Sequence, residues 1–79
     1  MGELIDELKD VVELLVDERD AVAIEETEDD EAVYFELEVA PDDLGKVIGR
    51  QGRTARALRT LLDARGEHDG ERYRLDILD

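Results

Sequence analysis

The sequence predicts an α+β fold in which three helices pack on a three-stranded sheet, in the order helix, strand, strand, helix, helix, strand. Apolar residues recur with a helical period near the N-terminus and with a period of two in residues 33–39 and 72–77. A proline and two glycines divide residues 41–64 into two further helices. Because 79 residues suffice for one modest core, we expect residues 1–79 to form a single domain.

The first helix is predicted over Leu4–Val16. At 100° per residue, seven apolar side chains fall within a stripe ~140° wide, which is typical of an amphipathic helix. These residues are Leu4, Ile5, Leu8, Val11, Val12, Leu15 and Val16. Leu14 lies well outside the stripe. Charged residues 17–20 break the pattern, and Val22 and Ile24 then alternate with alanines, which indicates a first strand.

An acidic stretch separates the first strand from the second. Residues 25–31 contain six carboxylates, and residues 33–39 then alternate between apolar and polar side chains. Two adjacent strands with a short polar link predict a hairpin. A divalent-cation site is the alternative use of the carboxylates, but they lack the Asp-x-Asp-x-Asp-Gly order of a calcium loop. We therefore expect a solvated turn.

Two helices are predicted after the hairpin, over residues 41–48 and 53–64. Pro41 suits the first helical position, and the two aspartates after it complement the positive end of the helix dipole. Gly49 can end the first of these helices, and Gly52 permits a sharp turn into the second.

The longer of these helices separates a core face from a basic face. Its apolar residues cover a face ~120° wide and are Ala55, Leu58, Leu61 and Leu62. Arg53 and Arg56 lie on the opposite side, with Arg59 at the edge. A polar loop over residues 66–70 is expected to lead into the final strand at 72–77. The single histidine lies in this loop, and we assign it no role.

The net charge of −14 is distributed unevenly along the chain. Residues 46–65 hold six basic residues and one acid, a local charge of +5, whereas the other 59 residues carry four basic and 23 acidic residues, a charge of −19. Because the Debye length is ~8 Å at physiological salt, a phosphate touching the basic segment would meet a locally positive surface. Alternatively, these basic residues pair with acids from other elements. The acidic remainder should discourage non-specific binding.

The composition argues against most kinds of catalysis. The chain has no serine, no cysteine and one histidine, so neither a Ser/His/Asp nor a Cys/His triad can form. We expect no enzyme activity, no cofactor, no metal and no small-molecule substrate. No apolar run approaches the ~18 residues that span a bilayer, and the N-terminus is acidic where a signal peptide is basic. These features predict a cytoplasmic protein without a membrane partner.

The segment Val47-Ile48-Gly49-Arg50-Gln51-Gly52-Arg53 places an apolar pair and a Gly-x-x-Gly loop between two helices. A tight glycine turn into a helix leaves backbone N–H groups unpaired, and the helix dipole favours an anion there. Because Gly49 and Gly52 have no side chains, a nucleic-acid backbone can approach closely. The motif and the order of elements resemble the type II KH domain, whose loop clamps four nucleotides. The alternative is an interhelical turn without a ligand.

Nearly the whole chain resembles the small stand-alone KH proteins of bacteria called the KhpA family, most clearly over residues 39–59. The resemblance implies a single-stranded RNA-binding protein, a post-transcriptional regulator or RNA chaperone. It also implies a homodimer, or a heterodimer with a larger KH-containing protein of the Jag type. Single-stranded DNA is a less expected ligand on this resemblance alone. The departure from the family is the unusual acidity of the first helix and the hairpin.

The resemblance also assigns roles to individual residues. The predicted RNA-binding residues are Lys46, Val47, Ile48, Gly49, Arg50, Gln51, Gly52, Arg53 and Arg56. The two glycines shape the loop, and Arg50 and Gln51 are its exposed pair. Lys46 and Arg53 flank the loop and are expected to pair with phosphates. The apolar pair before the loop, together with the second strand, would form a floor for bases, or would belong to the core.

Two alternatives concern the rest of the surface. Tyr34 and Tyr73 could stack on bases, although cross-strand or dimer contacts would explain them equally well. The competing hypothesis for the whole chain is a protein-interaction module, in which an exposed helix or sheet edge forms a dimer and RNA binding is residual. The acidic surface favours this second hypothesis.

Overall fold

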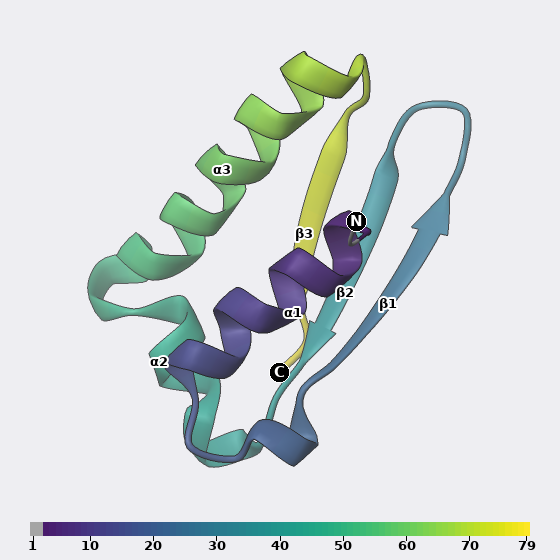
Figure 1. Cartoon of the computed structure of the whole chain (residues 1–79). Helices are drawn as coiled ribbons and strands as arrows, with labels where there is room; N and C mark the ends of the chain where they lie inside the picture. The colour runs from purple at the N-terminus through teal and green to yellow at the C-terminus, as the bar shows by residue number, and fades with distance from the viewer. Residues whose placement is uncertain (1–2) are drawn as a thin grey trace.

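The computed structural model describes residues 3–79 and has the predicted α+β architecture (Figure 1). Its helices are α1 (Leu4–Leu15), α2 (Leu44–Ile48) and α3 (Arg53–Asp69). Its strands are β1 (Ala23–Glu28), β2 (Val33–Glu38) and β3 (Tyr73–Ile77). Three short 3₁₀ turns complete the described chain, namely η1 (Arg19–Ala21), η2 (Pro41–Asp43) and η3 (Arg50–Gly52). No helix within residues 3–79 is both long and apolar enough to cross a membrane.

The sheet is mixed and has the order β1-β2-β3. β1 and β2 form the predicted antiparallel hairpin, whereas β3 runs parallel to β2. In Figure 1, α1 crosses in front of the sheet and α3 runs along the side on which β3 lies. Because β3 follows a long helix, its parallel pairing is the arrangement expected of a strand that returns through a crossover connection.

The core lies between the helices and one face of the sheet. Alternate residues of β2, namely Val33, Phe35 and Leu37, point into it. The helices and β3 complete the core with Leu8, Val12, Val47, Leu58, Leu62 and Leu75. Burying each such side chain favours folding by roughly 1.5–3 kcal/mol. The periodicities in the sequence are therefore those of the buried faces.

β1 is longer than the sequence predicted. Residues 25–28, which were expected in the acidic link, belong to the strand, and the turn begins at Asp29. Asp29 Oδ1 accepts hydrogen bonds from the backbone N–H groups of Glu31 (2.8 Å) and Ala32 (3.0 Å). The aspartate thus makes the turn, and the preceding glutamates keep their carboxylates in water on an edge strand. No group of side chains within residues 3–79 is suited to hold a metal.

α3 continues five residues beyond its predicted end at Ala64, through most of the segment expected to be a loop. Gly66 lies inside the helix, and a Cβ atom there would lie 2.5 Å from the carbonyl oxygen of Glu71. This glycine allows the returning chain to pass close to the helix, where the Glu71 N–H donates to Gly66 O (2.9 Å). Gly70, with φ +73°, ends the helix.

Two residues of the predicted apolar faces are on the surface. Ala55, Leu58 and Leu62 are buried as expected, but the side chain of Leu61 is 63% exposed. Val11 of α1, inside the predicted apolar stripe, is also 39% exposed. A stripe wider than the contact face leaves its edges uncovered, which explains both differences.

Candidate nucleic-acid interface

The Gly-x-x-Gly loop has a backbone that glycine makes possible. Gly49 has φ +78° and ψ 169°, a region essentially restricted to glycine. A Cβ atom at Gly49 would also collide with the side chain of Thr54 and would lie 2.8 Å from its backbone nitrogen. Gly52 (φ +74°) and Gln51 (φ 56°) also have positive φ. Gln51, a non-glycine residue with positive φ, carries strain of the order of 1 kcal/mol. The loop is therefore held in an unusual shape.

The loop leads directly into the N-terminus of a long helix. α3 begins at Arg53 and has no side-chain cap on its first turn. The Arg53 N–H donates to the Arg50 carbonyl, but the amides that follow it in the first turn lack intrahelical partners, and the macrodipole places roughly half a positive charge there. This combination favours an anion such as a phosphate.

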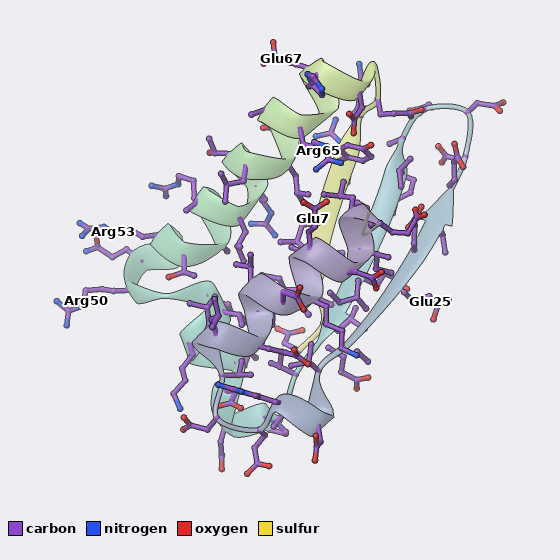
Figure 2. The ribbon with its side chains drawn as sticks, viewed as in Figure 1. Glu7, Glu25, Arg50, Arg53, Arg65 and Glu67 are labelled. Atoms are coloured by element: carbon purple, nitrogen blue, oxygen red, sulfur yellow. The ribbon has the colours of Figure 1, made fainter. Side chains whose placement is uncertain are left out.

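Arginine side chains surround this helix start. Figure 2 shows that Arg50 and Arg53 both point away from the body of the protein. Arg53 Nη2 donates a hydrogen bond to Gln51 Oε1 (3.2 Å), which links the two residues of the loop region. Within residues 3–79, Arg50, Arg53 and Arg56 form no ion pair with a carboxylate. Their charges are therefore available to a ligand.

Lys46 is placed differently from these arginines. Its ammonium group donates hydrogen bonds to Asp17 Oδ2 and to Asp43 Oδ1 (3.2 Å). The hydrogen bond to Asp17, followed by the one to Asp43, raises the pKa of Lys46 above its ordinary value. Two basic residues of the segment 46–65 therefore pair with acids from other elements, as the alternative interpretation of this segment predicts. They are Lys46 and Arg65, whose guanidinium contacts the Glu7 carboxylate at 3.2 Å.

A groove lies beside the loop, between α3 and β3. Its lining residues are Ile48, Gly52, Ala55, Arg56, Arg59 and Ile77, and its volume is about 380 Å³. The aliphatic side chains supply an apolar surface, and the arginines supply donors at its border. Ile48 lines this groove, whereas Val47 is fully buried and belongs to the core. β3 takes the place predicted for the second strand, because β2 is central in the sheet and β3 forms the edge beside α3.

The edge of β3 offers backbone groups to this groove. The backbone groups of Arg72 and Leu78 bond to β2. Because successive residues of a strand alternate in direction, the N–H and C=O groups of Leu75 and Ile77 face away from β2. The Leu75 carbonyl accepts two hydrogen bonds from the guanidinium of Arg59 (3.3 and 3.4 Å). The N–H and C=O groups of Ile77 therefore point toward the edge of the sheet on the side away from β2. Ile77 also lines the groove.

Three groove residues were absent from the sequence prediction: Ala55, Arg59 and Ile77. The spacing from Gly52 contains a signal for two of them, because residues three, four and seven positions along a helix share one face. Ala55, Arg56 and Arg59 have these spacings. No comparable local pattern marks Ile77, which reaches the groove through the sheet topology.

Neither tyrosine lines the groove. Tyr73 packs against Phe35, with ring centroids 5.8 Å apart, and its hydroxyl donates to Asp69 Oδ2 (2.7 Å). This hydrogen bond, assisted by burial, raises the pKa of Tyr73 to about 12. The Tyr34 hydroxyl donates to Asp29 Oδ2 (3.1 Å) at the hairpin turn. Both side chains have structural contacts, and the pairing of Tyr73 with Phe35 is the cross-strand contact that was the alternative to base stacking.

Comparison with known proteins agrees with this architecture. The family model described as KhpA/KhpB, KH domain, matches residues 5–77. The RNA-binding protein KhpA of Aquifex aeolicus is 54% identical over 76 residues, which cover 91% of this chain and 96% of that protein. The protein of the same name from Halalkalibacterium halodurans is 51% identical over 65 residues, covering 82% and 86%. That of Caldanaerobacter subterraneus is 44% identical over 78 residues, covering 99% and 100%.

No solved structure matches the chain significantly. The family match extends over all three helices and all three strands apart from the first residue of α1. It confirms the resemblance on which the fold prediction depended. The chain belongs to the KhpA/KhpB family of KH domains.

Proposed function

We propose that this chain binds single-stranded RNA, with the sugar-phosphate backbone at the loop of residues 49–52 and the bases in the groove beside β3. The observation that carries the proposal is the position of α3, whose N-terminus follows the loop and whose side wall carries groove residues. One element thus joins a phosphate-binding feature to a base-sized groove. The three relatives described above bear the name RNA-binding protein KhpA.

The backbone of the ligand is held by charge and by close approach. Arg50 and Arg53 point into solvent beside the loop, and Arg56 lies one helical turn farther along α3. Three phosphate contacts would make log K fall with log salt at a slope of roughly −2, at ~0.7 per contact for single strands. Because these contacts carry no sequence information, weak sequence preference is expected from them.

The bases are held by the groove. Its apolar surface, with Ile48 and Ile77, suits the faces of unstacked bases, and the Ile77 backbone offers a donor and an acceptor to a base edge. Arg56 and Arg59 border the same groove. Binding of this kind requires no covalent chemistry, and it fits a cytoplasmic post-transcriptional regulator or RNA chaperone.

The test replaces Arg50 and Gln51 with aspartates and titrates the folded variant with short single-stranded RNAs. We expect the affinity to fall at least tenfold, because the double substitution removes one cation and adds two anions at the loop. Circular dichroism verifies the fold, and single-stranded DNA of the same sequence tests the choice of RNA over DNA.

A matched control is available on the far face of the sheet. Thr27→Asp combined with Arg74→Asp makes the same change in net charge on the two strands that flank β2, where Thr27 and Arg74 both lie opposite Tyr34. This control should retain most of the affinity. Equal losses in the two double variants would attribute the effect to net charge and would refute binding at the loop.

A second candidate function is supported by an apolar groove between α1 and α3. It has a volume of about 210 Å³ and is lined by Leu4, Glu7, Leu8, Val11, Leu58, Leu61, Leu62 and Arg65. The exposed side chain of Leu61 lies at its border. We propose that this surface is covered in a homodimer or in a heterodimer with a larger KH-containing protein of the Jag type.

Self-association is tested by sedimentation of Leu61→Glu. We expect this variant to be monomeric at concentrations where the unaltered protein associates, because a charge would be buried in the contact. Leu14→Glu is the matched control, since Leu14 is 79% exposed on α1 and does not line the groove. Identical sedimentation of the unaltered protein and Leu61→Glu would refute this surface as the contact.

A further inference from the structure

Lys46 lies three positions before Gly49, yet its charge is already paired with carboxylates of the protein. Its ammonium group contacts the carboxylates of Asp17 and Asp43. Arg50 and Arg53, in and after the loop, form no such pair within the described chain. Of the three basic residues near the loop, Arg50 and Arg53 are therefore available to a ligand, whereas the charge of Lys46 is already paired with two carboxylates.

The two acids that hold Lys46 have different environments. Asp43 is 1% exposed, and its carboxylate also accepts the backbone N–H of Glu18 (2.9 Å). That backbone hydrogen bond is the main reason why the pKa of Asp43 lies below its ordinary value. The side chain of Asp17, by contrast, is 80% exposed, and among residues 3–79 it bonds to Lys46 alone. Asp43 is a structural anchor that also contacts Lys46, whereas the side chain of Asp17 contacts only Lys46 among the described residues.

We propose that Asp17 withholds Lys46 from RNA, so that neutralising Asp17 converts Lys46 into an additional phosphate contact beside the loop. The inference rests on the proposed binding of RNA at residues 49–52. Lys46 lies in α2 only three positions before Gly49, the residue that follows the helix and begins the loop. The flexible stem of a lysine allows its ammonium group to exchange one anion for another.

The substitution of Asp17 leaves the fold of the site in place. Asp43 keeps its hydrogen bond to Glu18, so the segment after α1 remains attached to the start of α2. The Lys46 side chain is already 44% exposed. Its release therefore requires a rotation of the side chain that also gives up the 3.2 Å contact with Asp43, and no movement of the backbone.

The experiment measures the affinity for a short single-stranded RNA over a range of salt concentrations. Four variants are compared with the unaltered protein: Asp17→Asn, Lys46→Met, the combination of both, and Asp42→Asn. The control Asp42 is an exposed acid of the same region that forms no ion pair within residues 3–79. Circular dichroism verifies that each variant is folded.

We expect Asp17→Asn to bind about fivefold more tightly near 0.1 M salt, with a salt slope steeper by about 0.7, as one added contact to a single strand predicts. Lys46→Met should leave the salt slope of the unaltered protein unchanged. The double variant should lack the gain, and Asp42→Asn should keep the original slope.

Three results would overturn the inference, the simplest being the absence of a gain in Asp17→Asn. A shallower salt slope in Lys46→Met would show that Lys46 already contacts phosphate. A gain in Asp17→Asn that persists in the double variant would show that the loss of a negative charge suffices. The loop variant Arg50→Asp/Gln51→Asp separates this inference from the proposed function. Affinity that survives in the loop variant overturns the proposed function, whereas loop-dependent binding without a gain in Asp17→Asn overturns only the role of Asp17.

Discussion

The start of α3 and the outer face of the sheet show how differently one chain can arrange its charges. At the start of α3, arginines gather at a glycine loop and have no carboxylate partner among residues 3–79. On the outer face, Glu25, Glu36 and Asp76 lie directly opposite one another across the three strands. Figure 2 places Glu25 on the side of the molecule away from Arg50 and Arg53.

The arginines at the start of α3 attract a polyanion, whereas the carboxylates on the outer face of the sheet repel one. Like charges directly opposite on a sheet are destabilising, so the row of carboxylates has a cost in stability. The same charges repel a polyanion from the outer face of the sheet. An acidic protein can thus bind RNA at one place and keep non-specific contacts low.

The largest effect that tests this comparison is expected from Gly49→Ala. The substitution combines an unfavourable φ with a Cβ that would lie 2.8 Å from the Thr54 nitrogen, and we expect it to cost about 2–3 kcal/mol of unfolding free energy as well as RNA affinity. Urea denaturation measures the stability. Gly52→Ala is the control, because its Cβ would meet open space. Equal stability losses in the two variants would contradict the proposed role of the Thr54 contact.

A smaller effect, confined to stability, is expected at the acidic end of α3. Gly66→Ala places a methyl group 2.5 Å from the Glu71 carbonyl, and overpacking of this kind costs about 1–3 kcal/mol. Gly45→Ala on α2 has open space and should stabilise by up to about 1 kcal/mol through helix propensity. RNA affinity should stay unchanged in Gly66→Ala. A loss of binding without a loss of stability in Gly66→Ala would contradict the account in which RNA contacts only the N-terminal end of α3.

The pH dependence of stability tests the anchor near the loop. The pKa of Asp43 is lowered in the folded protein, chiefly by the Glu18 N–H. Its contribution is therefore fully present above the unfolded-state value of about 3.9 and is lost as the pH falls through the lower folded pKa. Asp43→Asn should make the acid limb of the stability profile less steep. An identical acid limb in Asp43→Asn would show that other carboxylates, such as Asp69, determine it.

The smallest effect is expected on the outer face. Glu36→Gln removes the central charge of the row and should stabilise the protein by about 0.2–1 kcal/mol, more at low salt than at high salt because salt screens exposed charges. Asp10→Asn, an exposed acid on α1, is the control. A stabilisation by Glu36→Gln that does not depend on salt would point to packing in place of charge repulsion.

The fold could be predicted from the sequence wherever burial imposes a period. α1 and β2 appear as apolar patterns because their alternate or helical faces meet the core. The end of β1 could not be predicted in this way, since an edge strand bonds through its backbone and tolerates glutamates on both faces. The end of α3 could not be predicted either, because Gly66 was expected to start a loop. Glycine is common at helix ends, but here it allows close packing of the helix against Glu71.

The candidate site could be predicted in part. The glycine loop and its arginines are contiguous in the sequence, and the structure places them together at the start of α3. The pairing of Lys46 depends on Asp17, which is 29 positions away, and the contribution of Ile77 depends on β3 lying at the sheet edge beside α3. Both are consequences of topology, which local patterns do not contain.

The central claim is that RNA contacts the loop and the groove beside β3 and avoids the outer face of the sheet. Titration of isotope-labelled protein with a short single-stranded RNA, followed by amide chemical shifts, tests it residue by residue. The account predicts the largest shifts at residues 49–53, at Arg56 and Arg59 and at Ile77, with little change at Glu25 and Glu36. The largest shifts on the outer face, or in the apolar groove between α1 and α3, would contradict it.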